Sequence, residues 1–274
     1  TEGVEWCTDN ANTYNISAIT ISLGGEAYSA ACDADYSTLV TEINSAWTNN
    51  VSVVVATGNS GSSTEIASPA CISKVIAVSS VDKSLSIASN ADRNSITDIM
   101  SPGVSITSTA TSGASGCASA SSETKSCSGT SMAAPHVAGV IALLQQYKQD
   151  IEGRNLTVTE INDTITTNGS SIDDSGGSGV VFTMVDALLS LIALDELIPE
   201  LDEINTTLTR TYIYSNITFV ANATDTNLAT VIVETNHTGS NTNYTMTLNT
   251  DNNYNYSIDN TTFSTGTFQY RVHA

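Results

Sequence analysis

The string GTSMAAPHVAG at residues 129–139 contains a serine whose position suits nucleophilic chemistry. Gly129 permits a tight turn before the string becomes apolar and helical. Ser131 then stands at the start of a predicted helix, where unpaired N–H groups and the positive end of the helix dipole favour developing negative charge. Ala133 and Ala134 keep this turn thin, and Pro135 is expected in the first turn, where proline is tolerated. Taken alone, Ser131 could simply cap the helix.

Strands that alternate with helices must position this serine. Apolar or β-branched runs predict strands at 16–23, 51–56 and 75–81. Apolar residues at helical spacing predict helices at 1–12, 36–49, 131–149, 158–167 and 184–196, whereas 57–68 and 107–128 are expected to be loops. This alternation predicts an α/β fold with a parallel sheet that is buried on both faces.

The composition changes after Leu197. Residues 199–274 are rich in Asn, Thr and Tyr, with short alternating runs and a turn about every ten residues, which predicts a small all-β sandwich. The predicted domains are therefore 1–197 and 198–274. The second resembles the immunoglobulin-like modules of exported archaeal and bacterial proteins, which close with one more strand after a segment such as 268–272, so we expect its last strand to be missing.

The motifs of the first domain resemble those of subtilisin-like serine proteases. The string at 129–139 matches the nucleophile motif, ATGNSG (56–61) the oxyanion loop, and SLGG (22–25) the strand edge that pairs with substrate. Asn-Ser-Gly and Gly-Gly alone are ordinary turn signals, so their order before Ser131 matters. SPA (68–70), VIAV (75–78) and MSPGV (100–104) match more weakly. The resemblance covers roughly residues 1–195, the carboxyl-terminal half of such a domain.

The resemblance implies an acyl-transfer mechanism in which Ser131 attacks a peptide carbonyl while its own N–H and the Asn59 amide hold the oxyanion. The implied substrate-binding residues are Ser22, Leu23, Gly24, Gly58 and Ala67. The small Ala67 and Ser68 at the pocket floor allow a sizeable apolar side chain. No acidic residue is expected there to select Lys or Arg, with Glu65 the nearest doubtful case.

The base that the serine needs is missing. The family's Asp-Ser/Thr-Gly and His-Gly-Thr-His motifs precede the segment that opens this chain, and neither is present. His136 lies five residues after Ser131 and is expected to point around the helix, while no motif supports His237 or His273. Either an amino-terminal piece exists, which is cleaved but still docked, encoded separately or simply undetermined, or the chain is a half-domain without catalytic function. A parallel sheet lacking its leading strands would expose apolar faces, which favours a missing piece.

Five cysteines leave one unpaired. Cys117 and Cys127 flank a short loop and form the simplest pair. The resemblance places the loops of Cys32 and Cys71 beside the specificity pocket, so these two are expected to pair. Cys7 is then either a buried free thiol or the partner of a cysteine in the missing piece.

The resemblance implies no required cofactor. Some family members bind a weak cation near the turn that matches 100–104, and Asp98 stands at the corresponding place. Oxygen ligands suit a structural Ca²⁺ or Na⁺. A solvated surface aspartate is the alternative interpretation of Asp98.

The net charge and the N-glycosylation sequons indicate which partners the protein can bind and where it is located. With 28 acidic and 8 basic residues, the net charge of −20 makes nucleic acid an unsuitable partner. The dense sequons and the cysteines indicate a glycosylated extracellular or cell-surface protein. The predicted N-glycan sites are Asn15, Asn50, Asn155, Asn162, Asn168, Asn205, Asn216, Asn222, Asn236, Asn243, Asn255 and Asn260.

Two functions compete at this level. The first is a secreted or cell-surface serine endopeptidase, of which this chain is the nucleophile-bearing part, inactive alone and acting on peptides. The second is a structural or adhesive glycoprotein that reuses the fold without catalysis, including fibre formation by strand exchange through an open β-module.

Overall fold

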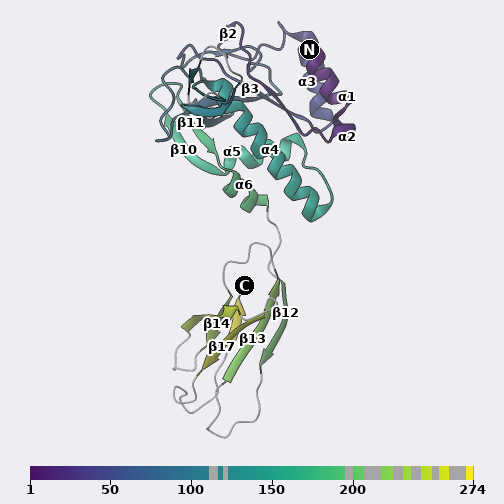
Figure 1. Cartoon of the computed structure of the whole chain (residues 1–274), viewed down its shortest axis with the longest axis vertical. Helices are drawn as coiled ribbons and strands as arrows, with labels where there is room; N and C mark the ends of the chain where they lie inside the picture. The colour runs from purple at the N-terminus through teal and green to yellow at the C-terminus, as the bar shows by residue number, and fades with distance from the viewer. Residues whose placement is uncertain are drawn as a thin grey trace. The chain divides into compact units, whose positions relative to one another are not determined.

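The computed structural model describes residues 1–110, 117–119, 123–194, 200–206, 217–224, 231–235, 242–248, 253–258 and 270–273. The chain divides into two compact units, Thr1–Asp195 and Glu196–Ala274 (Figure 1). The predicted boundary between 197 and 198 falls outside the described residues. No described helix combines the length and apolarity needed to cross a bilayer.

A six-stranded sheet forms the centre of the first unit, in the order β1-β3-β5-β6-β11-β10. Its strands are β1 (Ala18–Ile21), β3 (Ser52–Ala56), β5 (Ile76–Val81), β6 (Ile99–Pro102), β11 (Val180–Val185) and β10 (Gly169–Asp174). All neighbours run parallel except β10, which is antiparallel to β11. The predicted α/β class with a largely parallel sheet is thus confirmed.

Helices cover both faces of this sheet because its inner strands are apolar on both sides. Along β3, Val53 and Val55 pack in a cluster with residues of α1 and α3, whereas Val54 and Ala56 pack with α4 and α5. The helices are α1 (Glu2–Asp9), α2 (Ala11–Tyr14), α3 (Ser37–Thr48), α4 (Thr130–Glu152), α5 (Val158–Thr167) and α6 (Ala187–Leu194). The resulting three layers hold α4 against the sheet, with Ser131 at its amino-terminal end.

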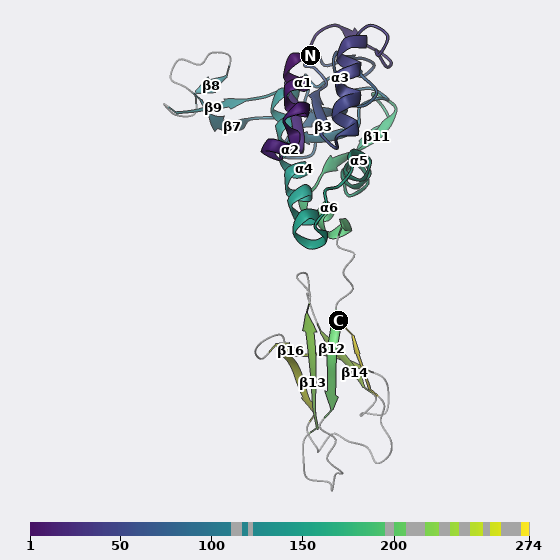
Figure 2. The same cartoon turned by 90° about the vertical axis from the view of Figure 1, so that its right-hand side faces the viewer.

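Three predictions of local structure were wrong. Part of the expected loop 107–128 forms a sheet in the order β7-β9-β8, from β7 (Ile106–Thr109), β9 (Thr124–Cys127) and β8 (Ala118–Ser119), which extends away from the body of the unit (Figure 2). The helix predicted at 184–196 starts later, at Ala187 in α6, because residues 184 and 185 are the last two of β11. Pro135 lies in the second turn of α4 rather than the first.

The second unit contains two antiparallel sheets. One has the order β12-β13-β17-β16 and the other β15-β14-β18. Their strands are β12 (Glu200–Thr206), β13 (Ile217–Thr224), β14 (Ile232–Thr235), β15 (Thr242–Thr245), β16 (Thr247–Leu248), β17 (Asn253–Ile258) and β18 (Tyr270–His273). Val231, Val233 and Met246 are buried in it. The immunoglobulin-like topology and the missing last strand stay predictions.

Candidate active site

Ser131 is the second residue of α4, and the glycine before this helix fixes how the helix begins. Gly129 has φ 152°, which L-residues rarely adopt, and a methyl group there would meet Asn59 Oδ1 at 2.9 Å. The Gly129 N–H donates to the Gly103 carbonyl at 2.8 Å, which ties the start of α4 to the end of β6. Ser131 is left half-buried, with a backbone N–H that no described residue accepts, as the helix start requires.

The Asn59 side chain is held beside this helix start. Its Oδ1 accepts the Thr130 N–H at 2.9 Å, and the Thr130 hydroxyl accepts the Gly58 N–H at 3.1 Å. These contacts occupy the amide oxygen and leave Nδ2 without an acceptor among the described residues. The Asn59 amide and the Ser131 N–H are therefore two free donors next to the Ser131 hydroxyl, as an oxyanion site requires.

Ser22 pairs with the nucleophile through both backbone and side chain. Because Pro135 has no N–H, the helix cannot bond the Ser131 carbonyl in the usual way, and the Ser22 hydroxyl donates to that carbonyl instead, at 2.9 Å. The Ser131 hydroxyl in turn donates weakly to the Ser22 carbonyl, at 3.4 Å. The strand edge predicted to align substrate thus lies directly beside Ser131.

One pocket of about 310 Å³ brings most of the predicted residues together. Leu23 and Gly24 come from the end of β1, Asn59 from the loop after β3, and Ser131 from α4. The predicted pocket residues Gly58 and Ala67 also line it, whereas Ser22 touches Ser131 without lining the pocket.

The pocket also contains a carboxylate that sequence reasoning missed. Asp92 lines it and is only 4% exposed, so the expectation of a pocket without an acidic residue was wrong. Glu65, the residue named for that role, is exposed and lies elsewhere. Asp92 belongs to no motif and is 33 positions from Asn59 in the sequence, so no local pattern signals its position.

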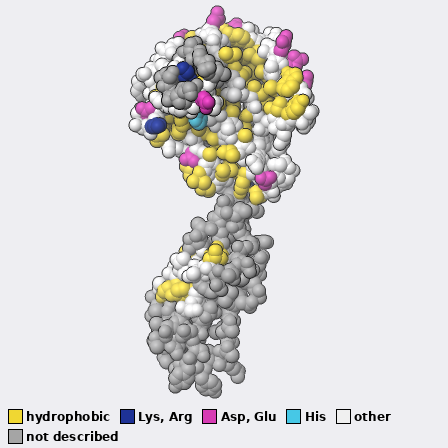
Figure 3. All heavy atoms as spheres, viewed as in Figure 1, with side chains coloured by type: hydrophobic (Ala, Val, Ile, Leu, Met, Phe, Trp, Pro, Cys, Tyr) yellow, Lys and Arg dark blue, Asp and Glu magenta, His cyan; other side chains and the backbone are white. Residues whose placement is uncertain are grey.

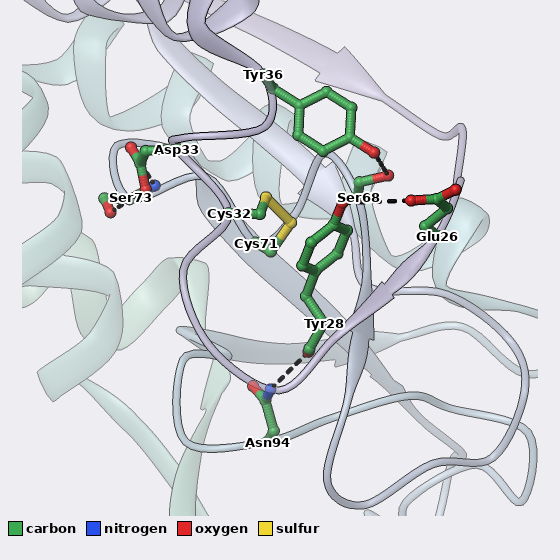
Figure 4. The surroundings of a disulfide bond; sticks show 9 residues. All are labelled: Glu26, Tyr28, Cys32, Asp33, Tyr36, Ser68, Cys71, Ser73 and Asn94. Carbon is green, nitrogen blue, oxygen red and sulfur yellow. Dashed lines mark hydrogen bonds between the residues drawn. A yellow bond between two sulfur atoms is a disulfide. The ribbon is translucent and has the colours of Figure 1, made fainter.

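The pocket walls are joined behind Gly24 and Ala67. β2 (Ala27–Tyr28) pairs with β4 (Ile66–Ala67), and the Gly25 N–H donates to the Ser68 carbonyl at 2.8 Å. The Tyr36 hydroxyl donates to Ser68 Oγ at 2.9 Å, and a Cys32–Cys71 disulfide closes the same region (Figure 4). The Cys117–Cys127 disulfide is present in the β7-β9-β8 sheet, and Cys7 is a half-buried free thiol.

No histidine side chain contacts the Ser131 hydroxyl within the described part of the chain. His136 is exposed and lines a second pocket together with Ser131, but its Nδ1–H donates to the Met132 carbonyl at 2.8 Å. His237 lies outside the described residues, and His273 is part of β18 in the second unit. No described histidine is therefore hydrogen-bonded to the Ser131 hydroxyl, as the general base of a serine hydrolase would be.

Asp98, the predicted cation ligand, lies outside the pocket at Ser131. Its Oδ2 accepts the Ala77 N–H at 2.6 Å, and it lines an apolar cavity of about 250 Å³ with Ile72 and Ile96. Burial raises the pKa of Asp98 to about 6, although the Ala77 N–H lowers it. No cluster of three or more His, Cys, Asp or Glu suited to a metal exists among the described residues.

The predicted glycosylation sites differ in access. Asn15, Asn155 and Asn243 are exposed, whereas Asn50, Asn162 and Asn168 are half-buried. Three more lie within strands of the second unit: Asn205, Asn222 and Asn255. The rest fall outside the described residues: Asn216, Asn236 and Asn260. Modification at these positions stays a prediction.

Comparisons with known proteins agree with this geometry. The chain is 42% identical over 127 residues to the "Thermophilic serine proteinase" of Bacillus sp. (strain AK1), which covers 46% of the chain and 29% of that protein. It is 34% identical over 177 residues to "Subtilisin DY" of Bacillus licheniformis, with 63% and 55% covered. The chain thus spans between about a third and about half of these relatives.

Solved structures show the same fold. A protease from Pseudoalteromonas arctica PAMC 21717 superposes with a TM-score of 0.57 at 31% identity, over 70% of this chain and 57% of the other. A cold-adapted subtilisin-like serine proteinase gives a TM-score of 0.51 at 28% identity, over 68% and 59%. The family profile described as Peptidase_S8, the Subtilase family, matches residues 1–184, two thirds of the chain. The chain therefore belongs to the subtilase family, whose members are serine peptidases.

Proposed function

We propose that this chain is the nucleophile-bearing part of a serine endopeptidase that works outside the cell or at its surface. The observation that carries the proposal is the pair of free donors beside a serine hydroxyl: the Ser131 N–H and Asn59 Nδ2, with Asn59 Oδ1 occupied by Thr130. The relatives of this chain are serine peptidases. The structural or adhesive alternative gains no support from those relatives.

In this mechanism Ser131 Oγ attacks the scissile carbonyl and forms an acyl-enzyme. The carbonyl oxygen becomes an oxyanion that Asn59 Nδ2 and the Ser131 N–H stabilise, and loss of one such donor typically costs about 2.7–4 kcal/mol. The main chain from Ser22 to Gly24 aligns the peptide as an added strand. The acyl-side residue then points into the pocket that Gly58 and Ala67 line.

The proposal requires a histidine base and an aspartate from residues outside the sequence described here, on an amino-terminal part of the peptidase domain. Two observations support that partner. No described imidazole reaches Ser131, and β1 is an edge strand of a parallel sheet whose Ile19 and Ile21 are only half-buried. A serine without its base retains only the residual catalysis of the oxyanion site and binding.

Several finer features belong to the same proposal. The second unit is an immunoglobulin-like accessory module, and a module open at one edge could join neighbouring copies by strand exchange. N-linked glycans and the two disulfides suit an oxidising extracellular location. No cofactor is needed for acyl transfer, and a structural Ca²⁺ or Na⁺ would be held by Asp98 together with backbone carbonyls.

A fluorophosphonate probe tests the proposal on the intact native protein. The probe should label Ser131, as identified by mass spectrometry of the labelled peptide, because an activated serine attacks it. Ser131→Ala should abolish labelling, whereas Ser128→Ala, which changes an exposed serine three residues earlier, should not. If the folded intact protein takes no label, or if Ser131→Ala still takes it, the endopeptidase proposal is wrong.

A further inference from the structure

Asp92 is a buried carboxylate without a cation. Its Oδ1 accepts the Ser60 N–H at 2.9 Å and the Ser62 N–H at 2.8 Å, which shapes the turn after Asn59. No described residue donates to its Oδ2 and none forms an ion pair with it. The adjacent Arg93 is committed elsewhere, to both oxygens of Asp174 at 2.8 and 3.0 Å.

The free oxygen faces the substrate pocket. A methyl group built on Gly58 would collide with Asp92 Oδ2 and would lie 3.0 Å from Ala67 Cβ, so Oδ2 lies against the bare Gly58 backbone. Gly58, Ala67 and Asp92 all line the pocket that opens at Ser131. The absent side chain at Gly58 therefore leaves this carboxylate oxygen open toward the pocket interior.

The unpaired Oδ2 of Asp92 favours a positively charged group in the pocket. A carboxylate that is 4% exposed and unpaired is costly, and a cation that enters the pocket would offset that cost. We propose that Asp92 makes the pocket selective for a cationic side chain on the acyl-side residue of the peptide, with Lys preferred over Arg. This inference rests on the proposed peptidase function and names its substrate class.

Lys is preferred over Arg because only one oxygen is available. Two backbone N–H groups occupy Asp92 Oδ1, so a guanidinium cannot form its two parallel hydrogen bonds to the carboxylate. An ammonium is a compact point charge that needs only Oδ2. The loop that carries Asp92 is fixed by the neighbouring Arg93–Asp174 ion pair, whose side chains are 15% and 9% exposed, so Oδ2 keeps its place at the pocket.

The test compares peptide substrates that differ only in the acyl-side residue: Lys, Arg, or norleucine, which has the same four-carbon chain without the ammonium. With the intact native protein, kcat/KM for Lys should exceed that for norleucine by at least about tenfold, the scale of a desolvated charge pair. In Asp92→Asn this ratio should fall to near one, because the variant keeps an amide oxygen for the Ser60 and Ser62 N–H groups but has no charge to attract the ammonium.

Asp82→Asn is the matched control. Asp82 Oδ1 also accepts two backbone N–H groups, from Ser84 and Ser86, but it lies outside the pocket, so this variant should keep the wild-type ratio. Three results would overturn the inference: equal turnover of the Lys and norleucine substrates, a Lys preference that survives Asp92→Asn, or faster turnover of Arg than of Lys. The wild-type comparison stands even if Asp92→Asn fails to fold.

A binding measurement separates this inference from the proposed function. If no substrate is cleaved and Ser131 takes no fluorophosphonate, the peptidase proposal has failed, and the pocket is judged by affinity alone. Calorimetry with Ser131→Ala protein and the same peptides should then show at least about tenfold tighter binding of Lys than of norleucine. Equal affinities would overturn the role of Asp92.

Discussion

Three polar side chains, two at this site and one outside it, use their polar atoms unequally. Asn59 commits its oxygen to Thr130 and keeps its N–H groups free. Asp92 commits one oxygen to the turn after Asn59 and keeps the other at the pocket. Asp98 commits Oδ2 to Ala77 and otherwise faces an apolar cavity, which raises its pKa to about 6. Because the pKa of Asp98 is raised, its contribution to the free energy of unfolding depends on pH.

Asp98 should make the protein less stable as the pH rises. Its carboxyl binds a proton more tightly in the folded state, with a pKa of about 6, than in the unfolded chain, where about 3.9 is usual. Below about pH 4 the Asp98 carboxyl does not change the free energy of unfolding. As the pH rises to about 6 and above, its ionisation lowers that free energy by roughly 3 kcal/mol in total. The difference in free energy of unfolding between Asp98→Asn and wild type should grow by about this amount from pH 4 to pH 7.

Urea unfolding across this pH range, in buffers with EDTA and choline as the cation, measures the difference without a bound metal. Asp82→Asn, which alters a half-buried aspartate that also accepts two backbone N–H groups in a turn, should give a difference that does not vary over the same window. A pH-independent difference for Asp98→Asn would contradict the prediction.

Residues within one contiguous motif could be predicted from the sequence, and residues brought in by a distant loop could not. Ser131 and Asn59 each lie in a contiguous motif, and the resemblance of these motifs to those of subtilisin-like proteases indicated their roles. Asp92 reaches the pocket because the loop around it folds back onto the loop after β3, where its N–H donates to the Gly58 carbonyl at 3.1 Å. No periodicity or turn signal encodes such a contact.

At the scale of elements, the pocket lies where separate segments of the chain meet, and few β-sheet hydrogen bonds connect these segments. The segment after β1 and the end of β4 form two of its walls, and β2 and β4 pair over only two residues each. The Cys32 N–H donates to the Cys71 carbonyl at 3.0 Å beside the disulfide (Figure 4). The disulfide therefore links these two segments covalently at a place where few strand hydrogen bonds connect them.

Removal of the Cys32–Cys71 bridge should cost more stability than removal of Cys117–Cys127. The first closes a loop with a sequence separation of 39 and the second one of 10. Loop-closure entropy gives about 4 and about 3 kcal/mol respectively. Urea unfolding of the double variants Cys32→Ser/Cys71→Ser and Cys117→Ser/Cys127→Ser checks the order. The reverse order, or no loss in the first variant, would show that the pocket walls hold without the bridge.

The sequence predicted buried elements better than edge elements. β3 and β5 are buried over their whole length and carry the apolar runs Val53–Ala56 and Ile76–Val78, which predict strands directly. β10 and β7 are largely polar and exposed at sheet edges, so their pairing partners, rather than their own residues, determine that they are strands. The hairpin of β10 and β11 was missed for this reason.

At the scale of the whole molecule, charge is far from balanced. Arg93, Lys148 and Arg154 form ion pairs in the first unit, yet the chain has 20 more acidic than basic side chains. Figure 3 shows acidic side chains spread around the visible face of that unit. Mutual repulsion among them opposes the compact state and is screened by salt.

Added salt should therefore stabilise this protein. Raising ionic strength from about 10 mM to about 500 mM shortens the screening length from about 30 Å to a few Å, which weakens carboxylate repulsion more than it weakens the few partly buried ion pairs. The thermal unfolding midpoint should rise with NaCl and by the same amount with choline chloride. A midpoint that stays level or falls in both salts would mean that the ion pairs outweigh the repulsion. A larger rise with Na⁺ than with choline, lost in Asp98→Asn, would instead assign part of the effect to a cation bound at Asp98.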